Sequence, residues 1–557
     1  MESKLIDAIQ HDMPNVLQSL LPNDTLLNYI FSDHINSNHQ ILHNGPPIHC
    51  VAAYYGSVQC LQFLYDRGSR FVEKDKLSNS ILDFASAGNH TELFDFLLNH
   101  GYSKQTLCDF SIEKDNPFII QYLCENQHID SSSILFQAVK SNCFEILKYI
   151  VTIVDDINVI DDFGNTALHI AVANSHHNII RYLLSLENEA ELKTKIDINP
   201  KNPINGETIL HLAAKKQNTD ILSLILSSYN INSHQRSVWD FMTMDFMAIE
   251  NDIRRASTNE VPKPTQHAVD LNPKDSSGDT PFIIAAREGS VSVLREFISL
   301  ASDDSLVSIN SFNKNGDTAL IVSVENNREP IVKELIDLDS IDLNHKNRDG
   351  VSALHIACKN QNLEIALMLI HAFNININLP TDFDNATPLH IICSIHNMNN
   401  PELSHNAEII FDTLLQSPDT DLNALNDEKM TPLQLSAKEG NEKFFIKLLQ
   451  HPKSDISITD KFGMTILHAA ARFNHIEICK LIFENCGEQS SKGKIDINQR
   501  DNDGWTPLHY AARNAFEDIV ELLLSQPGIN VNVKDNRDKP PLYFAMNRNI
   551  ITMIKNH

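Results

Sequence analysis

The chain has 557 residues, with 45 lysines and arginines against 72 aspartates and glutamates, so its formal net charge is −27 at pH 7. This charge argues against nucleic acid as a partner, and no apolar run is long enough to insert into a membrane. The first residues, MESKLIDAIQHD, lack the apolar core of a secretory signal, and the nine cysteines are scattered without a C-x-x-C pair. We therefore expect an intracellular, monomeric protein with reduced thiols, located in the cytoplasm, with a nuclear location left open.

The amino-terminal segment, residues 1–46, is predicted to be a helical cap. Within it, LIDAIQHDMPNVLQSLL (residues 5–21) has the apolar spacing of two short helices. No turn sequence precedes this pair, which distinguishes it from the units that follow.

Residues 506–524, TPLHYAARNAFEDIVELLL, show the unit that recurs through the rest of the chain. Thr506 can cap a helix that begins at Pro507, where the missing N–H of proline costs nothing. Ala511 and Ala512 let another helix approach closely, and a second apolar series begins at Ile519. Matching starts occur at Thr166, Thr208, Thr280, Thr318, Ser352, Thr387, Thr431 and Thr465, with weaker ones near Pro47, Asn79, Thr106, Ser133 and Pro540.

Two short signals mark the limits of each first helix. A turn such as Asn502-Asp503-Gly504 precedes it. A glycine or asparagine, which tolerates a left-handed conformation, stands where the helix should end. These residues are Gly56, Gly88, Asn142, Gly289, Asn327, Gly440, Asn474 and Asn549. A single helix pair of this size cannot bury its own apolar face, so it needs similar neighbours.

The T-P-L-H-x-A-A start, the glycine or asparagine, the apolar second helix and the aspartate-glycine turn, repeated at about 33 residues, resemble the ankyrin repeat. The amino-acid composition of these repeats is similar to that of the divergent, many-repeat ankyrin families of unicellular eukaryotes. The resemblance covers almost the whole chain. It implies an all-α solenoid of stacked antiparallel helix pairs with hairpin or loop fingers, in about 15 repeats.

One segment breaks the register of the repeats. Residues 242–251, MTMDFMAIEN, align as a degenerate start, but Pro262 and Pro264 interrupt the second helix that should follow. We therefore predict an amino-terminal array over residues 47–229, a degenerate repeat plus loop over residues 230–279, and a carboxy-terminal array over residues 280–557 that ends in a truncated repeat.

Six histidines occupy one position of the unit: His169, His211, His355, His390, His468 and His509. Because they recur once per repeat, no two can share one metal ion. The resemblance implies a structural role for them instead, a hydrogen bond to the backbone of the neighbouring turn. The turn at residues 501–504 imitates half a calcium loop, but Tyr510 stands where the bidentate glutamate belongs. No signature of a nucleotide-binding loop, a nucleophile or a zinc peptidase occurs, so we expect no enzyme, no cofactor and no metal.

The resemblance also implies that partners meet the finger tips and the exposed positions of the first helix. Most residues there are Asn, Asp, Lys or Ser, and the aromatic residues stand out. We predict a partner-binding patch formed by Phe462, Met464, Arg472, Phe473, Trp505 and Arg513, because aromatic residues and arginine are enriched at interfaces. Tyr54 and Tyr55 are the next candidates, and Phe163 is a further exposed aromatic. The alternative is that Trp505 folds onto its own hairpin and that Phe473 packs under the following loop.

The predicted function is protein–protein interaction. We expect a non-enzymatic adaptor or scaffold that binds one or more proteins through the concave face and fingers of the solenoid. The alternative is a regulatory subunit or inhibitor that occludes the active site of an enzyme. The identity of a co-purifying partner, a cytoskeletal protein or an enzyme, would separate these two functions.

Overall fold

A computed structural model of the chain describes residues 1–21, 29–32, 40–126, 128–186, 193–228, 270–301, 307–395, 401–486 and 495–557. Within these residues the regular elements are helices, and no β-strand is present. The contacts divide the chain into two compact units. Unit 1 holds residues 1–216 and 220–269, and unit 2 holds residues 217–219 and 270–557.

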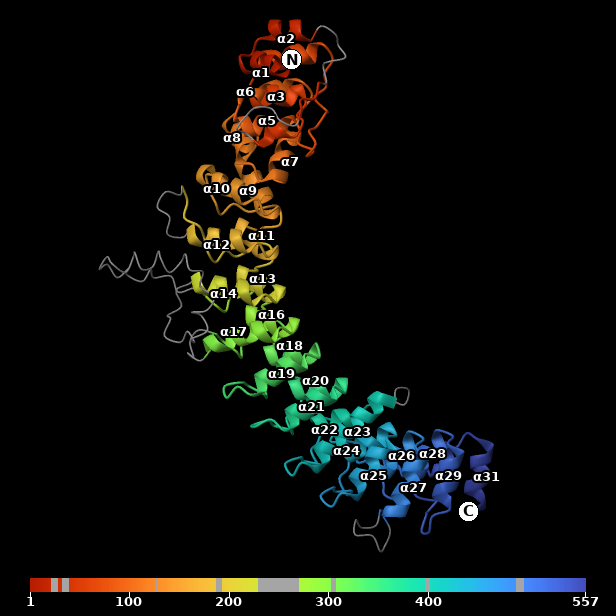
Figure 1. Ribbon diagram of the computed structural model, residues 1–557. Helices are drawn as coiled ribbons and strands as arrows, with labels where there is room; N and C mark the ends of the chain where they lie inside the picture. Colours follow the sequence, from red (N-terminus) through yellow and green to blue (C-terminus); the bar gives the residue numbers. More distant parts are fainter. Residues whose placement is uncertain are drawn as a thin grey trace, which may run out of the picture. The chain divides into compact units, whose positions relative to one another are not determined.

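Unit 1 is built from short antiparallel helix pairs (Figure 1). Its helices are α1 (Glu2–Gln10), α2 (Pro14–Leu20), η2 (Gln40–His43), α3 (Ile48–Tyr54), α4 (Val58–Asp66), α5 (Ile81–Gly88), α6 (Glu92–Asn99), α7 (Lys104–Lys114), α8 (Pro117–Glu125), α9 (Ser131–Lys140), α10 (Phe144–Ile153), α11 (Ala167–Ala173), α12 (His177–Ser185), α13 (Ile209–Lys216) and α14 (Thr219–Ser228). The caps of α7 and α9 are Ser103 and Asp130, three residues before the predicted starts at Thr106 and Ser133, so these two first helices are longer than expected.

Unit 2 repeats the same construction. Its helices are α16 (Pro281–Glu288), α17 (Val291–Ala301), α18 (Ala319–Glu325), α19 (Glu329–Ile336), α20 (Ala353–Asn360), α21 (Leu363–Ile370), α22 (Pro388–Cys393), α23 (Pro401–Gln416), α24 (Pro432–Glu439), α25 (Glu442–Gln450), α26 (Ile466–Arg472), α27 (Ile476–Asn485), α28 (Pro507–Arg513), α29 (Glu517–Leu524), α30 (Pro541–Phe544) and α31 (Arg548–Asn556). None of the helices in the described ranges of either unit is long and apolar enough to cross a membrane.

Each pair packs on the next pair of its unit. In unit 2 the first helices α24, α26, α28 and α30 contact one another in order, and the second helices α25, α27, α29 and α31 do the same (Figure 1). Ala511 and Ala512 of α28 are fully buried between its neighbours, as are Ile519 and Val520 of α29. Each pair thus buries its apolar face against similar pairs. The predicted all-α solenoid of about fifteen helix pairs is confirmed over the described residues.

Most of the predicted left-handed helix ends are present. Gly56, Asn142, Gly289, Asn327, Gly440 and Asn474 have φ angles between 52° and 84°. The prediction was wrong at Gly88, which is the last helical residue of α5, and the left-handed residue is Asn89 with φ 61°. Gly88 is small for a different reason, since a Cβ there would lie 2.1 Å from the carbonyl oxygen of Tyr54. Asn549 was also wrongly assigned, because it lies inside α31.

The fingers before the first helices are tight turns held by one acidic or amide side chain. In the turn at Asp501, Oδ1 accepts hydrogen bonds from the backbone N–H groups of Asp503 and Trp505, at 3.0 and 2.8 Å. Asp161, Asp275, Asn313, Asp460 and Asp535 accept the same pair of bonds. The acidic residue that imitated a calcium ligand therefore serves the turn itself.

Consecutive fingers and loops are also bonded to each other. The N–H of Asn502 donates to the carbonyl of Phe462 at 2.9 Å, which links two fingers. In the loops after the second helices of six repeats, one asparagine makes two hydrogen bonds to the neighbouring loop. Asn423 Nδ2 donates to the carbonyl of Lys453 at 2.8 Å, and its Oδ1 accepts from the N–H of Asp455 at 2.9 Å. Asn158, Asn310, Asn344, Asn378 and Asn498 make the same pair of bonds. Much of the abundant asparagine is thus structural.

The predicted division of the chain stays a prediction. Most of the proposed degenerate repeat, residues 230–269 of 230–279, lies outside the described residues. The boundaries of the two arrays at residues 47–229 and 280–557 are likewise untested.

Candidate interaction surface

The repeat histidines connect the start of their own helix to the next repeat. Nδ1 of His468 accepts a hydrogen bond from the N–H of Thr465 at 3.2 Å, and its Nε2 donates to the carbonyl of Trp505 at 3.0 Å. His169, His355, His390 and His509 make the equivalent two bonds, while His211 is buried with its Nδ1 bonded to Thr208. The ring that accepts at Nδ1 and donates at Nε2 is a neutral imidazole.

Burial also keeps these rings neutral. It lowers the pKa of His169, His390, His468 and His509 below the usual value for histidine, and that of His355 to about 4. Both nitrogens of a ring that makes the two bonds are occupied, so neither is available to a metal. Within the described ranges no group of three His, Cys, Asp or Glu side chains could hold a metal ion.

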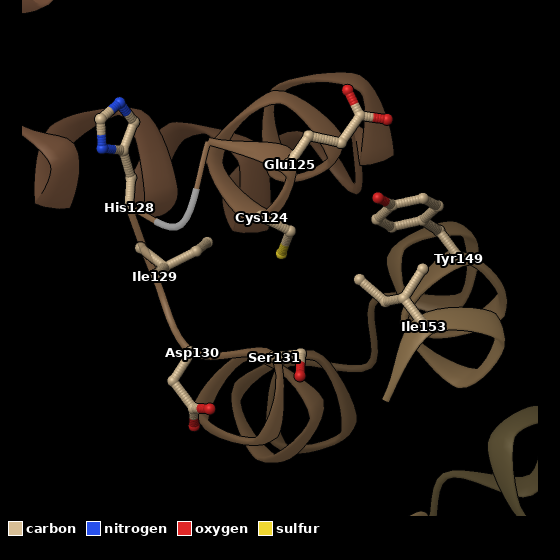
Figure 2. A pocket seen from close by; sticks show the side chains of 8 residues that line it. All are labelled: Cys124, Glu125, His128, Ile129, Asp130, Ser131, Tyr149 and Ile153. Carbon is tan, nitrogen blue, oxygen red and sulfur yellow. The ribbon is translucent and has the colours of Figure 1, made fainter. Parts of the chain in front are cut away.

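A cavity in unit 1 offers little for catalysis. It has a volume of about 560 Å³ and lies between the end of α8, the start of α9 and α10 (Figure 2). The sulfur of Cys124 faces into it beside Ile129 and Ile153, whereas the carboxylates of Glu125 and Asp130 point away. Burial raises the pKa of the Cys124 thiol to about 11, so the reactive thiolate is scarce at neutral pH.

The predicted binding residues separate into exposed and buried groups. Phe462 and Phe473 are 48% and 41% exposed, Arg513 is exposed, and Arg472 and Tyr55 are half-buried. Trp505, Met464 and Tyr54 are buried, so their expected exposure was wrong. Phe163 is 75% exposed.

The position in the repeat explains why Trp505 and Met464 are buried. Each directly precedes the capping threonine of a first helix. At that position in other repeats, Glu207, Asp279, Asp317, Ala386 and Met430 are buried as well, and Asn165 and Val351 are half-buried. The carbonyl of this residue commonly receives the histidine bond from the previous repeat, as at Trp505, which fixes the backbone against that repeat. The Trp505 ring packs 4.6 Å from Phe544 and 4.9 Å from Tyr510, between centroids.

Five of the six residues of the predicted patch, all but Phe462, nevertheless form one connected cluster across α26 and α28 through Tyr510. Arg472 Nη1 lies 3.6 Å from the sulfur of Met464, and its guanidinium carbon lies 5.5 Å from the centroid of Phe473. The same carbon lies 5.4 Å from the Tyr510 ring in the next repeat. The guanidinium carbon of Arg513 lies 5.2 Å from the ring centroid of Trp505. The buried side chains of Met464 and Trp505 thus contact the guanidinium groups of Arg472 and Arg513, respectively.

Sequence reasoning missed Tyr510, which joins the two repeats. Its hydroxyl donates to Asp501 Oδ2 at 2.7 Å, and its ring receives Arg472. The signal was available, since Tyr510 fills the variable position between the repeat histidine and the alanine pair. The exposed Phe383 (88%) and Phe373 (87%) were also missed, because isolated phenylalanines in turns carry no pattern.

Comparisons with known proteins agree with this architecture. Family models described as "Ankyrin repeats (3 copies)" match residues 110–195, 135–237, 256–347, 402–493, 445–535 and 489–555, and one described as "Ankyrin repeats (many copies)" matches residues 335–392. The chain is 28% identical over 210 residues to the "Probable 26S proteasome regulatory subunit p28" of Saccharomyces cerevisiae, which covers 37% of this chain and 84% of that protein.

Two longer relatives are matched over more of this chain. They are the "NAD-dependent deacetylase sir2B" of Dictyostelium discoideum, 22% identical over 391 residues, and the "Transient receptor potential cation channel subfamily A member 1" of Homo sapiens, 25% identical over 488 residues. The matches cover 64% and 81% of this chain but only 47% and 40% of those proteins. Together with the histidine and finger geometry, the family models identify this chain as a member of the ankyrin-repeat family, whose repeats are protein-interaction modules.

Proposed function

We propose that this protein is a non-enzymatic adaptor or scaffold that binds other proteins through its fingers and the ends of its first helices. The observation that carries the proposal is the exposure of phenylalanines at these positions. Phe163 and Phe383 at finger turns are 75% and 88% exposed, and Phe473 at the end of α26 is 41% exposed. Large aromatic side chains contribute much of the energy of protein interfaces, and the turns themselves are held by other groups.

The polar groups of the repeats support the same proposal. The histidines and the turn aspartates are occupied in bonds within the array, and burial raises the pKa of Cys124, which lines a cavity of unit 1, to about 11. Nine free cysteines, eight of them buried, suit a reducing compartment, so we place the protein inside the cell.

A second candidate is a regulatory subunit that acts by covering a site on an enzyme. The specific observation that favours it is the similarity to a relative whose name includes "26S proteasome regulatory subunit". In this case the partner would be an enzyme, and addition of the purified chain would lower or redirect its activity.

The test is capture of partners by the full chain and by two matched variants. Phe462→Ser with Phe473→Ser removes two exposed rings of unit 2, and Phe373→Ser removes an exposed ring (87%) from the loop after α21. We expect the double variant to lose at least one partner, identified by mass spectrometry, and the single variant to retain all of them. If the full chain captures no protein, or if both variants capture the same set as the parent, the proposed binding site is wrong.

A further inference from the structure

The carboxy-terminal repeats of unit 2 carry a surface of cations placed over aromatic rings. We call it the cation–ring surface and define it by Lys461, Phe462, Arg472, Phe473, Tyr510 and Arg513. The Lys461 Nζ lies 5.1 Å from the centroid of Phe462, and Arg472 lies over both Phe473 and Tyr510. Arg513 lies over the buried Trp505. One repeat further along, Lys539 lies 4.3 Å from the ring of Tyr543.

The two arginines of this surface have no acidic partner among the described residues. No carboxylate lies within ion-pair distance of Arg472 or Arg513 there, and stacking on rings leaves most of their N–H donors free. Lys461 has one weak pairing, 3.5 Å from Glu428. Arg472 and Arg513 therefore keep their charge available to a partner, in a chain whose net charge is −27.

Two acidic residues of the same fingers are turned inward. Asp460 and Asp501 are buried and accept backbone N–H groups of their own turns. Asp501 also accepts the hydroxyl of Tyr510. These carboxylates therefore hold the fingers and make no ion pair with the arginines, although the charge of Arg472 acts on Asp460 over a longer distance. Exposed acidic residues of this region, Asp503 and Asp538, stand in the finger turns.

We propose, as a deepening of the proposed function and resting on it, that the cation–ring surface binds an acidic, extended segment of the partner protein. The guanidinium groups offer forked hydrogen bonds to carboxylates, and the rings offer apolar contact to the side chains between them. Charge complementarity is the reason for choosing an acidic partner, since a basic one would be repelled by Arg472 and Arg513.

The distance between neighbouring repeats sets the spacing that we expect between acidic residues of the partner segment. The helices α26 and α28 pack directly, so their axes are about 8–10 Å apart. Arg472 and Arg513 are the last residues of these helices, and they repeat at that distance. In an extended polyproline-II segment, with three residues per turn and a rise of about 3.1 Å per residue, every third side chain lies on the same side about 9 Å apart, so an acidic residue at every third position matches the arginines.

A protein segment fits this surface better than nucleic acid does. Nucleic acid carries a dense, regular charge, and the field of a strongly acidic chain repels it. A peptide can place single carboxylates on the arginines and leave uncharged residues opposite Asp503 and Asp538.

The test uses the full chain and a fluorescein-labelled peptide of about twelve residues, about 37 Å long in the polyproline-II conformation, that repeats Glu-Leu-Ser. Control probes are the same peptide with glutamine for glutamate, one with the same composition and glutamates clustered at one end, and a single-stranded DNA oligonucleotide of equal charge. We expect the Glu-Leu-Ser peptide to bind most tightly by fluorescence anisotropy, and its affinity to fall as salt is raised.

The variants are R472Q with R513Q, which keep much of the side-chain stem, and K359Q as the matched control. Lys359 is exposed near the end of α20 and occupies the same repeat position there as Arg472 in α26 and Arg513 in α28. We expect the double variant to bind about tenfold more weakly and K359Q to bind like the parent. Equal binding of the glutamine or clustered peptide, tighter binding of the oligonucleotide, or no effect of R472Q/R513Q would overturn the inference. If R472Q/R513Q captures the same cellular partners as the parent, the inference is wrong but the proposed function stands. If the parent itself captures no partner, both the inference and the proposed function are wrong.

Discussion

Replacing His468 by alanine tests whether the repeat histidines carry much of the coupling between repeats. The ring is fully buried, accepts from the N–H of Thr465 and donates to the carbonyl of Trp505. Removing it leaves one buried donor and one buried acceptor without a partner, and each costs about 1–3 kcal/mol. Because a water molecule can enter the space and satisfy part of this loss, we expect the free energy of unfolding of this region to fall by roughly 2–4 kcal/mol.

The chain itself provides the control for this variant. In the repeat that begins at Thr431, Gln434 occupies the histidine position, and its Oε1 accepts from the N–H of Thr431 at 2.9 Å. Its Nε2 donates to the carbonyls of Ile458 and Met464, at 2.9 and 3.3 Å. An amide can therefore make both bonds, and H468Q should cost less than about 1 kcal/mol.

The assay is urea unfolding followed by the fluorescence of Trp505. This residue packs beside the substituted position, and Trp239, the other of the two tryptophans, is replaced by phenylalanine in every sample. Because repeats contact only their neighbours, the local transition can be followed separately from the rest of the chain. A variant H468A that unfolds at the urea concentration of the parent, or an H468Q that is as unstable as H468A, would refute the reasoning.

Three further predictions concern acid, glycine and asparagine. Burial lowers the folded-state pKa of His355 to about 4, so its contribution to the free energy of unfolding is complete above pH 6.5 and is lost as the pH falls towards 4, by up to roughly 3 kcal/mol. H355Q should therefore reduce the difference between the urea midpoints at pH 7 and at about pH 4.5, and an unchanged difference would contradict this. Gly350 has φ 69°, and a Cβ added there would lie 2.3 Å from the Cβ of Asp382, whereas Gly528 has φ 86° and open space around it. G350A should therefore lower the melting temperature clearly more than G528A does, and equal shifts would argue against finger contacts. Asn423→Ala removes two exposed hydrogen bonds to the next loop and should lower the free energy of unfolding, measured in urea, by about 0.5–1.5 kcal/mol. Asn423→Asp keeps the acceptor and should cost less. An alanine variant as stable as the parent would show that these asparagines do not contribute to stability.

The helix starts were predictable from sequence, but the helix ends were predictable only in part. A threonine followed by proline and a buried leucine is a local signal, and it placed most first helices correctly. The left-handed residue nine positions later was recognised only where it is glycine or asparagine. The structure places Ser175, Gln361 and Ala515 in the same conformation, with φ between 56° and 63°. Packing of the second helix imposes the turn whichever residue stands there, and this is tertiary information.

The sequence predicted that the residues of the candidate surface lie close together, but it did not predict which of them are buried. Arg472, Phe473 and Arg513 lie at the helix ends where the register put them, and contacts join them to Met464 and Trp505. The residue before each threonine was taken as exposed because it belongs to a finger. Alanine and methionine at this position in other repeats, Ala386 and Met430, were the signal that it faces inward. A tryptophan there attracted attention by its type, although the position decides its burial.

The distribution of exposed side chains favours a scaffold over an inhibitor of one enzyme. In unit 1, Phe163 and Ile204 are 75% and 67% exposed on neighbouring finger turns, which Asn202 joins by donating to the carbonyl of Phe163 at 2.9 Å. That pair is apolar, whereas the cation–ring surface of unit 2 places Arg472 and Arg513 on rings. The framework bonds are the same in both units, so these differences do not arise from folding requirements. Two surfaces of different chemistry suit two different segments, and a chain that engages two segments can bring separate proteins together.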